Sequence, residues 1–155
     1  MKKIVISQRI DKNYKRRELL DSLDQRFSKL LLSSGYLNIP IPNSLGDAQS
    51  EWLYSVQPDG ILLTGGNDIH EFEIRDRTEL NLLEYSLNNK IPVLGICRGM
   101  QIIAHWAKAE LHQVSGHIGT THNLYGEIKE TVNSYHNYSL KSCPIDFAVI
   151  ARSED

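Results

Sequence analysis

Apolar residues in the first two thirds of the chain fall in short continuous runs, which alternate with longer stretches whose apolar residues recur every three or four positions. Continuous runs are typical of strands buried on both faces of a sheet, and the longer spacing is typical of helices with one buried face. We expect strands at residues 3–7, 36–41, 61–63 and 91–96, and helices at residues 17–33, 47–56, 77–88 and 98–108. This alternation predicts an α/β fold with an open, mostly parallel sheet flanked by helices.

The pattern changes after Ala109. Residues 110–114, 126–132 and 147–152 have the composition of strands separated by loops, and no stretch there has convincing helical periodicity. We therefore expect a partly antiparallel second half, within a single domain that covers residues 1–155.

Composition and charge narrow the classes of partner. Of the 155 residues, 41% are hydrophobic and 23% are charged, as in one soluble domain. The 17 basic and 19 acidic residues give a net charge of −2, which predicts neither nucleic acid nor an anionic membrane as a partner. No apolar run approaches the roughly 20 residues needed to cross a bilayer. Two distant cysteines, Cys97 and Cys143, without a secretory leader, predict a cytoplasmic protein.

The strongest chemical signal is a cysteine between two glycines, in the segment Gly95-Ile96-Cys97-Arg98-Gly99. It lies where a predicted strand gives way to a predicted helix. Such an elbow holds a nucleophile out of the sheet in a strained position, and a helix N-terminus favours the thiolate form of a cysteine. The amide of Arg98 would point toward a carbonyl oxygen that develops negative charge. We expect Cys97 to be a nucleophile of acyl chemistry; the alternative is a small buried hydrophobic residue.

A paired-glycine loop, Thr64-Gly65-Gly66-Asn67-Asp68, follows the strand predicted at residues 61–63. Parallel strands end at the same edge of a sheet, where ligands of open α/β sheets bind. The amide of Gly66 could therefore be a second oxyanion donor beside that of Arg98. An ordinary turn between a strand and a helix is the alternative.

Together these segments resemble the class I glutamine amidotransferase family, with its flavodoxin-like core, and within it the free-standing γ-glutamyl hydrolases. The resemblance spans essentially the whole chain and is carried by LLTGGND at 62–68, RDRTE at 75–79, GICRGMQ at 95–101 and VNSYH at 132–136. The segments ISQR at 6–9, LDSLD at 20–24 and PIPN at 40–43 also resemble members that are linked to surface-polysaccharide pathways.

The resemblance implies hydrolysis of a small γ-glutamyl substrate through a cysteine thioester, with release of glutamate and without a cofactor or a metal. Cys97 would attack the amide carbon while the amides of Gly66 and Arg98 hold the oxyanion. The family's contacts to the glutamyl group would fall on Gln101, Asn133, Ser134, Tyr135 and His136. The leaving group stays open among an amine-derived acid, a folate glutamate tail and a nucleotide amidate of surface-polysaccharide biosynthesis.

The family's general base is a histidine of a later His-Pro-Glu motif, which this sequence does not contain. We therefore expect a domain that is incomplete at its C-terminus, and a 155-residue polypeptide that is a poor enzyme. His136 would contact substrate rather than act as the base. His105 and His112, on one possible helix, and the other histidines match no compact set of metal ligands.

Two other functions stay open alongside a stand-alone hydrolase. A glutaminase subunit that passes ammonia to a synthase partner would use the same elbow chemistry. A catalytically incomplete domain could instead keep only the glutamyl pocket. The sequence leaves the oligomeric state open.

Overall fold

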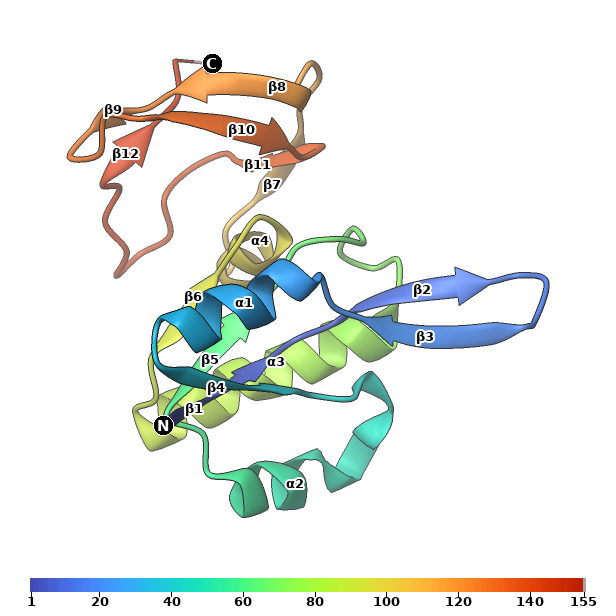
Figure 1. Cartoon of the computed structure of the whole chain (residues 1–155). Helices are drawn as coiled ribbons and strands as arrows, with labels where there is room; N and C mark the ends of the chain where they lie inside the picture. Colours follow the sequence, from blue (N-terminus) through green and yellow to red (C-terminus); the bar gives the residue numbers. More distant parts are fainter. Residues whose placement is uncertain (155) are drawn as a thin grey trace. The chain divides into compact units, whose positions relative to one another are not determined.

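The computed structural model of the chain describes residues 1–154 and is shown in Figure 1. The chain divides into two compact units, Met1–Ile102 and Ile103–Asp155, each with its own strands. The expectation of a single domain stays a prediction. No helix within residues 1–154 is long and apolar enough to cross a membrane.

The first unit is built on a four-stranded sheet in the order β4-β1-β5-β6, and every neighbouring pair in it is parallel. Its strands are β1 (Lys2–Ile6), β4 (Tyr36–Pro40), β5 (Gly60–Leu63) and β6 (Val93–Gly95). The inner strands β1 and β5 carry much of the apolar core. The predicted parallel sheet is therefore confirmed. The strand expected to be buried at residues 91–96 is shorter, and Leu94 is 61% exposed because β6 is an edge strand.

Helices flank this sheet (Figure 1). They are α1 (Gln25–Ser33), α2 (Gln49–Val56), α3 (Glu73–Asn89) and the start of α4 (Arg98–Trp106), with the 3-10 segment η1 (Asn43–Ala48) before α2. α1 packs against β4, and α3 packs against β5 and η1. Most of the residues that α3 buries are polar or charged, which is unusual for a helix that faces a sheet.

The helix predicted at residues 17–33 is wrong in its first part. Residues 9–22 form an antiparallel hairpin of two strands, β2 (Arg9–Asn13) and β3 (Glu18–Ser22). Asp24 is the N-cap of α1, because its side chain accepts a hydrogen bond from the amide of Arg26 at 2.8 Å. The leucines before Asp24 fit a helical face by their spacing alone. In the hairpin, however, the backbone of Leu19 pairs with β2, and its side chain is 62% exposed.

In the described part of the second unit, residues 103–154, every strand pair is antiparallel: β8 with β10, β7 with β11 and β9 with β12. Their bounds are β7 (Leu111–Gln113), β8 (Ile118–Asn123), β9 (Tyr125–Gly126), β10 (Thr131–Tyr135), β11 (Tyr138–Leu140) and β12 (Ala151–Arg152). The predicted antiparallel pairing is confirmed, but two strand predictions are wrong in detail. Residues 126–132 belong to two strands with a loop between them, and only the end of residues 147–152 is paired. β8 is polar and mostly exposed, so its sequence lacks the apolar pattern from which strands were predicted.

Candidate active site

The carboxyl ends of β5 and β6 bring the paired-glycine loop beside the cysteine. Leu63 lies opposite Gly95 in the parallel register, and the amide of Ile96 donates a hydrogen bond to the Leu63 carbonyl at 2.9 Å. A methyl group on Gly65 would lie 3.4 Å from the Cβ of Cys97 and 3.8 Å from its sulfur. The loop and the elbow therefore meet at one edge of the sheet, as their positions after parallel strands predict.

Cys97 occupies the turn between β6 and α4. Its side chain is exposed, and its φ of 54° is in the left-handed region, which costs a non-glycine residue about 1 kcal/mol. The amides of Met100 and Gln101 donate to the Cys97 carbonyl at 3.0 and 3.2 Å, so the first helical turn starts directly from the cysteine. Within residues 1–154, no group accepts a hydrogen bond from the amide of Gly66 or of Arg98. Each amide therefore retains a donor for a bound oxygen.

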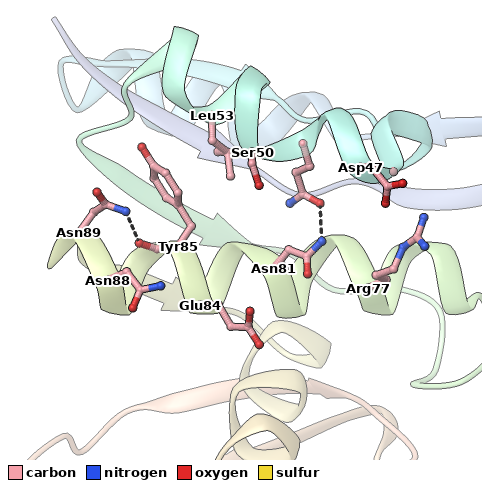
Figure 2. A pocket seen from close by; sticks show the side chains of 11 residues that line it. Asp47, Ser50, Leu53, Arg77, Asn81, Glu84, Tyr85, Asn88 and Asn89 are labelled. Atoms are coloured by element: carbon pink, nitrogen blue, oxygen red, sulfur yellow. Dashed lines mark hydrogen bonds between the residues drawn. The ribbon is translucent and has the colours of Figure 1, made fainter.

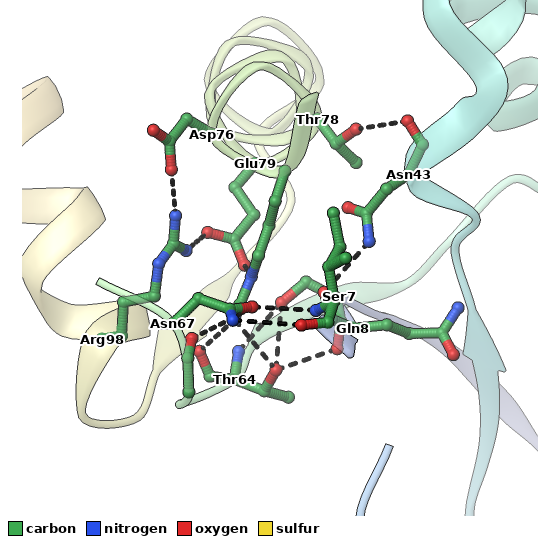
Figure 3. A network of polar contacts seen from close by, with 12 residues as sticks. Ser7, Gln8, Asn43, Thr64, Asn67, Asp76, Thr78, Glu79 and Arg98 are labelled. Carbon is green, nitrogen blue, oxygen red and sulfur yellow. Dashed lines mark hydrogen bonds and ion pairs between the residues drawn. The ribbon is translucent and has the colours of Figure 1, made fainter. Parts of the chain in front are cut away.

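Four charged side chains form a buried network next to the elbow (Figure 3). Arg98 forms ion pairs with Asp76 and Glu79, and Glu79 also accepts a hydrogen bond from Arg75 at 3.2 Å. None of the four residues is more than 7% exposed. Two guanidiniums and two carboxylates offset one another's charge, as buried charged groups require. The network fixes the first residue of α4 to α3.

Arg75 also holds the paired-glycine loop. Its guanidinium donates hydrogen bonds to the carbonyls of Thr64 and Gly65, at 2.9 and 3.1 Å, and to that of Gly66. The amide of Thr64 donates to the hydroxyl of Ser7, after β1, at 2.9 Å. One network therefore orients both segments that meet at the sheet edge.

Burial sets the electrostatics of this network. It lowers the pKa of Arg75 and that of Arg98 to about 10, because a buried guanidinium loses its hydration. The positive charge of Arg75 lowers the pKa of Arg98 further, and the carboxylate of Asp76 opposes the shift in both. Both guanidiniums stay protonated near neutral pH, so the network keeps its two positive charges. Their contribution is to position the backbone rather than to exchange protons.

Gly99 lies where the first turn of α4 meets β5. A methyl group on Gly99 would lie 2.6 Å from the carbonyl carbon of Leu63 and 2.9 Å from its Cβ, and these atoms move only with β5. We expect Gly99→Ala to lower the free energy of unfolding, measured by urea denaturation, by about 3 kcal/mol or more.

The matched control for this substitution is Gly60→Ala. A methyl group on Gly60 would meet the flexible end of the Ile4 side chain, at 2.9 Å, and no backbone atom closer than 3.7 Å. We expect a loss of about 1 kcal/mol. Equal losses at Gly60 and Gly99 would contradict the view that the β5 backbone excludes a side chain at the elbow.

The residues predicted to contact a glutamyl group are divided between the two units. Gln101 is buried on α4 in the first unit. The others lie on or directly after β10 in the second unit: Asn133, Ser134, Tyr135 and His136. The Ser134 hydroxyl donates to the carbonyl of His117 at 2.7 Å, and Tyr135 is exposed. The part of these residues in substrate binding stays a prediction.

Three histidines gather in the second unit. The His117 ring is stacked on that of His122, with centroids 4.7 Å apart, and lies 4.9 Å from that of His136. Among residues 1–154, no group of three or more histidine, cysteine, aspartate or glutamate side chains has the arrangement of a metal site. His105 is on α4 and His112 on β7, so the helix expected to carry both is wrong.

A separate cavity of about 460 Å³ lies between α3 and the segment formed by η1 and α2 (Figure 2). Polar side chains cross it: Asn81 donates to the side chain of Gln49 at 3.1 Å. None of the predicted site residues in the described chain lines this cavity. It therefore adds no chemical group to the sheet edge that carries Cys97.

The charged network is the part of the site that the sequence analysis missed. Arg75, Asp76 and Glu79 entered it only as letters of a motif, and Arg98 only through its amide. Arg75 and Glu79 are four positions apart and share a face of α3, but the helix predicted at residues 77–88 began after Arg75, so the prediction did not contain this pair. That spacing alone does not show whether a pair is buried or exposed.

The sequence of this chain is similar to those of several known proteins. The profile of the family "Glutamine amidotransferase class-I" matches residues 18–155. A γ-glutamyl-CDP-amidate hydrolase of Campylobacter jejuni is 30% identical, over 98% of this chain and 78% of its own length. A glutamine-hydrolysing GMP synthase subunit of Methanococcus aeolicus is 28% identical, over 87% of this chain and 74% of its own.

Solved structures share the fold. A candidate GMP synthase subunit of Thermoplasma acidophilum superposes with a TM-score of 0.74 at 23% identity, over 99% of this chain and 74% of its own. A glutamine amidotransferase of Thermotoga maritima superposes with a TM-score of 0.67 at 16% identity, over 99% of this chain and 67% of its own. These similarities confirm the α/β fold with a parallel sheet flanked by helices.

Proposed function

Because the chain belongs to the class I glutamine amidotransferase family, we propose that it hydrolyses the γ-glutamyl amide bond of a small substrate, with Cys97 as the nucleophile. The observation that carries this proposal is the exposed thiol on the turn between β6 and α4, directly beside Gly65. The amides of Gly66 and Arg98 flank the same edge and supply the donors that an oxyanion needs.

In the first step, the sulfur of Cys97 attacks the side-chain amide carbon of the glutamyl group, and the two amides stabilise the negative oxygen. The bond from that carbon to nitrogen then breaks, the thiol proton ends on the departing nitrogen, and a γ-glutamyl thioester remains on Cys97. Water adds to the thioester, the carbon–sulfur bond breaks, and glutamate leaves. In this scheme Arg75, Glu79 and the Arg98 side chain are positioning residues.

A γ-glutamyl nucleotide amidate is the substrate that we infer. The Campylobacter jejuni relative is named for γ-glutamyl-CDP-amidate, and it aligns with 98% of this chain. Hydrolysis of such a compound would release glutamate and a nucleotide that keeps the amide nitrogen on its phosphate. The resemblance to members linked to surface-polysaccharide pathways supports a role of the reaction there.

A glutaminase that supplies ammonia to a synthase partner is the second candidate. It is favoured by four relatives named as GMP synthase subunits, which match 87% or more of this chain at 27 to 30% identity. Glutamine and a γ-glutamyl amide differ only in the leaving group, so the same thiol and amides would serve either reaction.

Glutamate release from γ-glutamyl-CDP-amidate and from glutamine separates the two candidates. We expect kcat/KM to be at least about 100-fold higher for the nucleotide amidate, because only that leaving group offers further contacts. The opposite preference would support the glutaminase. If neither substrate is cleaved and a glutamine analogue with a diazoketone in place of its amide leaves Cys97 unmodified, the chain is a binding domain and the proposal of a hydrolase fails.

A further inference from the structure

Arg9 lies against the paired-glycine loop at the sheet edge. It is the first residue of β2, which begins shortly after the carboxyl end of β1. A methyl group on Gly66 would lie 3.0 Å from the Cδ of Arg9 and 3.4 Å from its Cβ. Cys97 approaches Gly65 at a similar distance. The proposed nucleophile and Arg9 therefore lie beside two consecutive residues of the same loop.

Hydrogen bonds of Asn67 hold the start of β2 in this place. Its side chain accepts from the amide of Ile10 at 2.8 Å, donates back to the Ile10 carbonyl at 3.1 Å, and also accepts from Arg75 at 3.1 Å. Besides burial, which is the main cause, the charge of Arg9 lowers the pKa of Arg75, and the charge of Cys97 raises it. Both groups therefore lie close to the buried arginine that fixes the loop.

The guanidinium of Arg9 is accessible to a ligand, unlike those of the two arginines in the charged network. Arg75 and Arg98 are buried and paired with carboxylates, whereas the Arg9 side chain is 51% exposed. Its Nε donates to Asp11 at 3.1 Å, and its Nη2 donates to the same carboxylate at 3.3 Å. Within residues 1–154, Nη1 of Arg9 donates no hydrogen bond. Because exposed ion pairs contribute little to stability, this guanidinium can turn toward an anion or share itself with one.

The proposed substrate brings an anion to this place. In a γ-glutamyl nucleotide amidate, the nitrogen of the scissile amide is bonded directly to phosphorus, so the phosphorus is two bonds from the carbon that Cys97 attacks. The oxygen on that carbon would accept hydrogen bonds from the amides of Gly66 and Arg98. The first phosphate must therefore lie close to Gly66, which the side-chain stem of Arg9 contacts. Glutamine has a hydrogen in place of this phosphate.

We propose that Arg9 determines the preference for the amidate, because its guanidinium binds the phosphate on the scissile nitrogen. This inference rests on the proposed function and adds to it a residue that distinguishes a γ-glutamyl phosphoramidate from glutamine. With glutamine bound, Arg9 stays paired with Asp11 and contributes nothing to binding. With the amidate bound, Nη1 and Nη2 form a charge-assisted pair with two phosphate oxygens, the geometry for which arginine is suited.

The test is the protection of Cys97 from iodoacetamide by γ-glutamyl-CDP-amidate and by glutamine, followed on the Cys97 peptide by mass spectrometry. In Arg9→Gln, we expect the amidate concentration for half protection to rise about 30-fold, and that of glutamine to change less than about threefold. Arg9→Lys keeps the charge but loses the fork of donors, so we expect a rise of about tenfold. The ratio of kcat/KM for amidate over glutamine should fall by the same factors.

Arg16→Gln is the matched control. Arg16 is an exposed arginine in the turn between β2 and β3, so the substitution removes the same charge from the same hairpin away from Gly66. We expect less than about a threefold change for either substrate, because salt screens a charge at this distance.

Each outcome decides the inference. Equal losses in Arg9→Gln and Arg16→Gln would mean that only the general charge attracts the amidate, and equal losses for both substrates in Arg9→Gln would mean that the loop is disturbed; either result overturns the assignment, as does the absence of protection by the amidate up to about 1 mM. Modification of Cys97 by the diazoketone analogue, with amidate protection that ignores Arg9, would leave the hydrolase standing and reject the role of Arg9. Protection that depends on Arg9, without glutamate release or diazoketone modification, would keep that role and reject the hydrolase.

Discussion

Cys97→Ser is expected to lower the rate of glutamate release by about 10⁴-fold or more. A serine hydroxyl is ionised far less than a thiol near neutral pH, so serine is a much weaker nucleophile at the same position. The measurement has two parts. Steady-state release of glutamate reports turnover, and the mass gained from the diazoketone analogue reports attack by the thiol even where turnover is slow.

Cys143→Ser is the matched control. Cys143 is also exposed, and its thiol donates to the carbonyl of Phe147 at 3.4 Å in a loop of the second unit. The substitution makes the same chemical change away from the elbow, so we expect unchanged turnover and unchanged labelling. If labelling were lost in Cys143→Ser and kept in Cys97→Ser, Cys143 would be the nucleophile and the mechanism proposed above would be wrong.

Glu79→Gln is expected to lower the free energy of unfolding by about 3 to 5 kcal/mol. The substitution leaves two guanidiniums, those of Arg75 and Arg98, with the single carboxylate of Asp76, all of them buried. The free-energy cost of a buried positive charge without a partner is far larger than the stabilisation that hydrogen bonds from the new amide can restore. Urea denaturation measures the loss, and a slower reaction of Cys97 with the diazoketone analogue, at constant reaction with iodoacetamide, would show that the elbow has lost its alignment.

Two further variants make this test specific. Glu84→Gln removes the same charge from an exposed position of α3, and we expect a change within about 0.5 kcal/mol. The double variant Glu79→Met with Arg98→Met removes one charge of each sign, so it should lose less stability than the sum of its single substitutions. Strict additivity would contradict the idea that the four charges act as one network.

The elbow and the paired-glycine loop could be predicted from the sequence because each has a local cause. The glycine-containing segments at Cys97 and at positions 65 and 66 follow apolar runs that predict parallel strands, and parallel strands end at the same edge. The proximity of Gly65 to Cys97, whose Cβ would lie 3.4 Å from a methyl group on Gly65, follows from these rules. Family membership then adds the chemistry that local rules leave open.

The hairpin and the charged network could not be predicted in the same way. Leu19 has helical spacing to the leucines that follow it, yet its conformation is decided by pairing with β2, a contact that no local pattern contains. Arg75 and Glu79 have the spacing of an exposed ion pair. Their burial depends on how α3 lies against β5 and on the ion pair with Arg98, which is 23 positions after Arg75 in the chain. Only the folded structure reveals these contacts.

The left-handed turn at Cys97 makes the thiol a reporter of the native state. Its backbone is strained by about 1 kcal/mol, and that strain persists only while Gly99 lies against Leu63 and Arg98 stays paired with α3. A peptide with the sequence of residues 91–106 would relax to an unstrained backbone conformation, and its cysteine would react as a cysteine of an unfolded chain does. Preference for a glutamyl reagent over a plain alkylating agent therefore belongs to the folded sheet, and it should vanish at the same urea concentration at which the sheet unfolds.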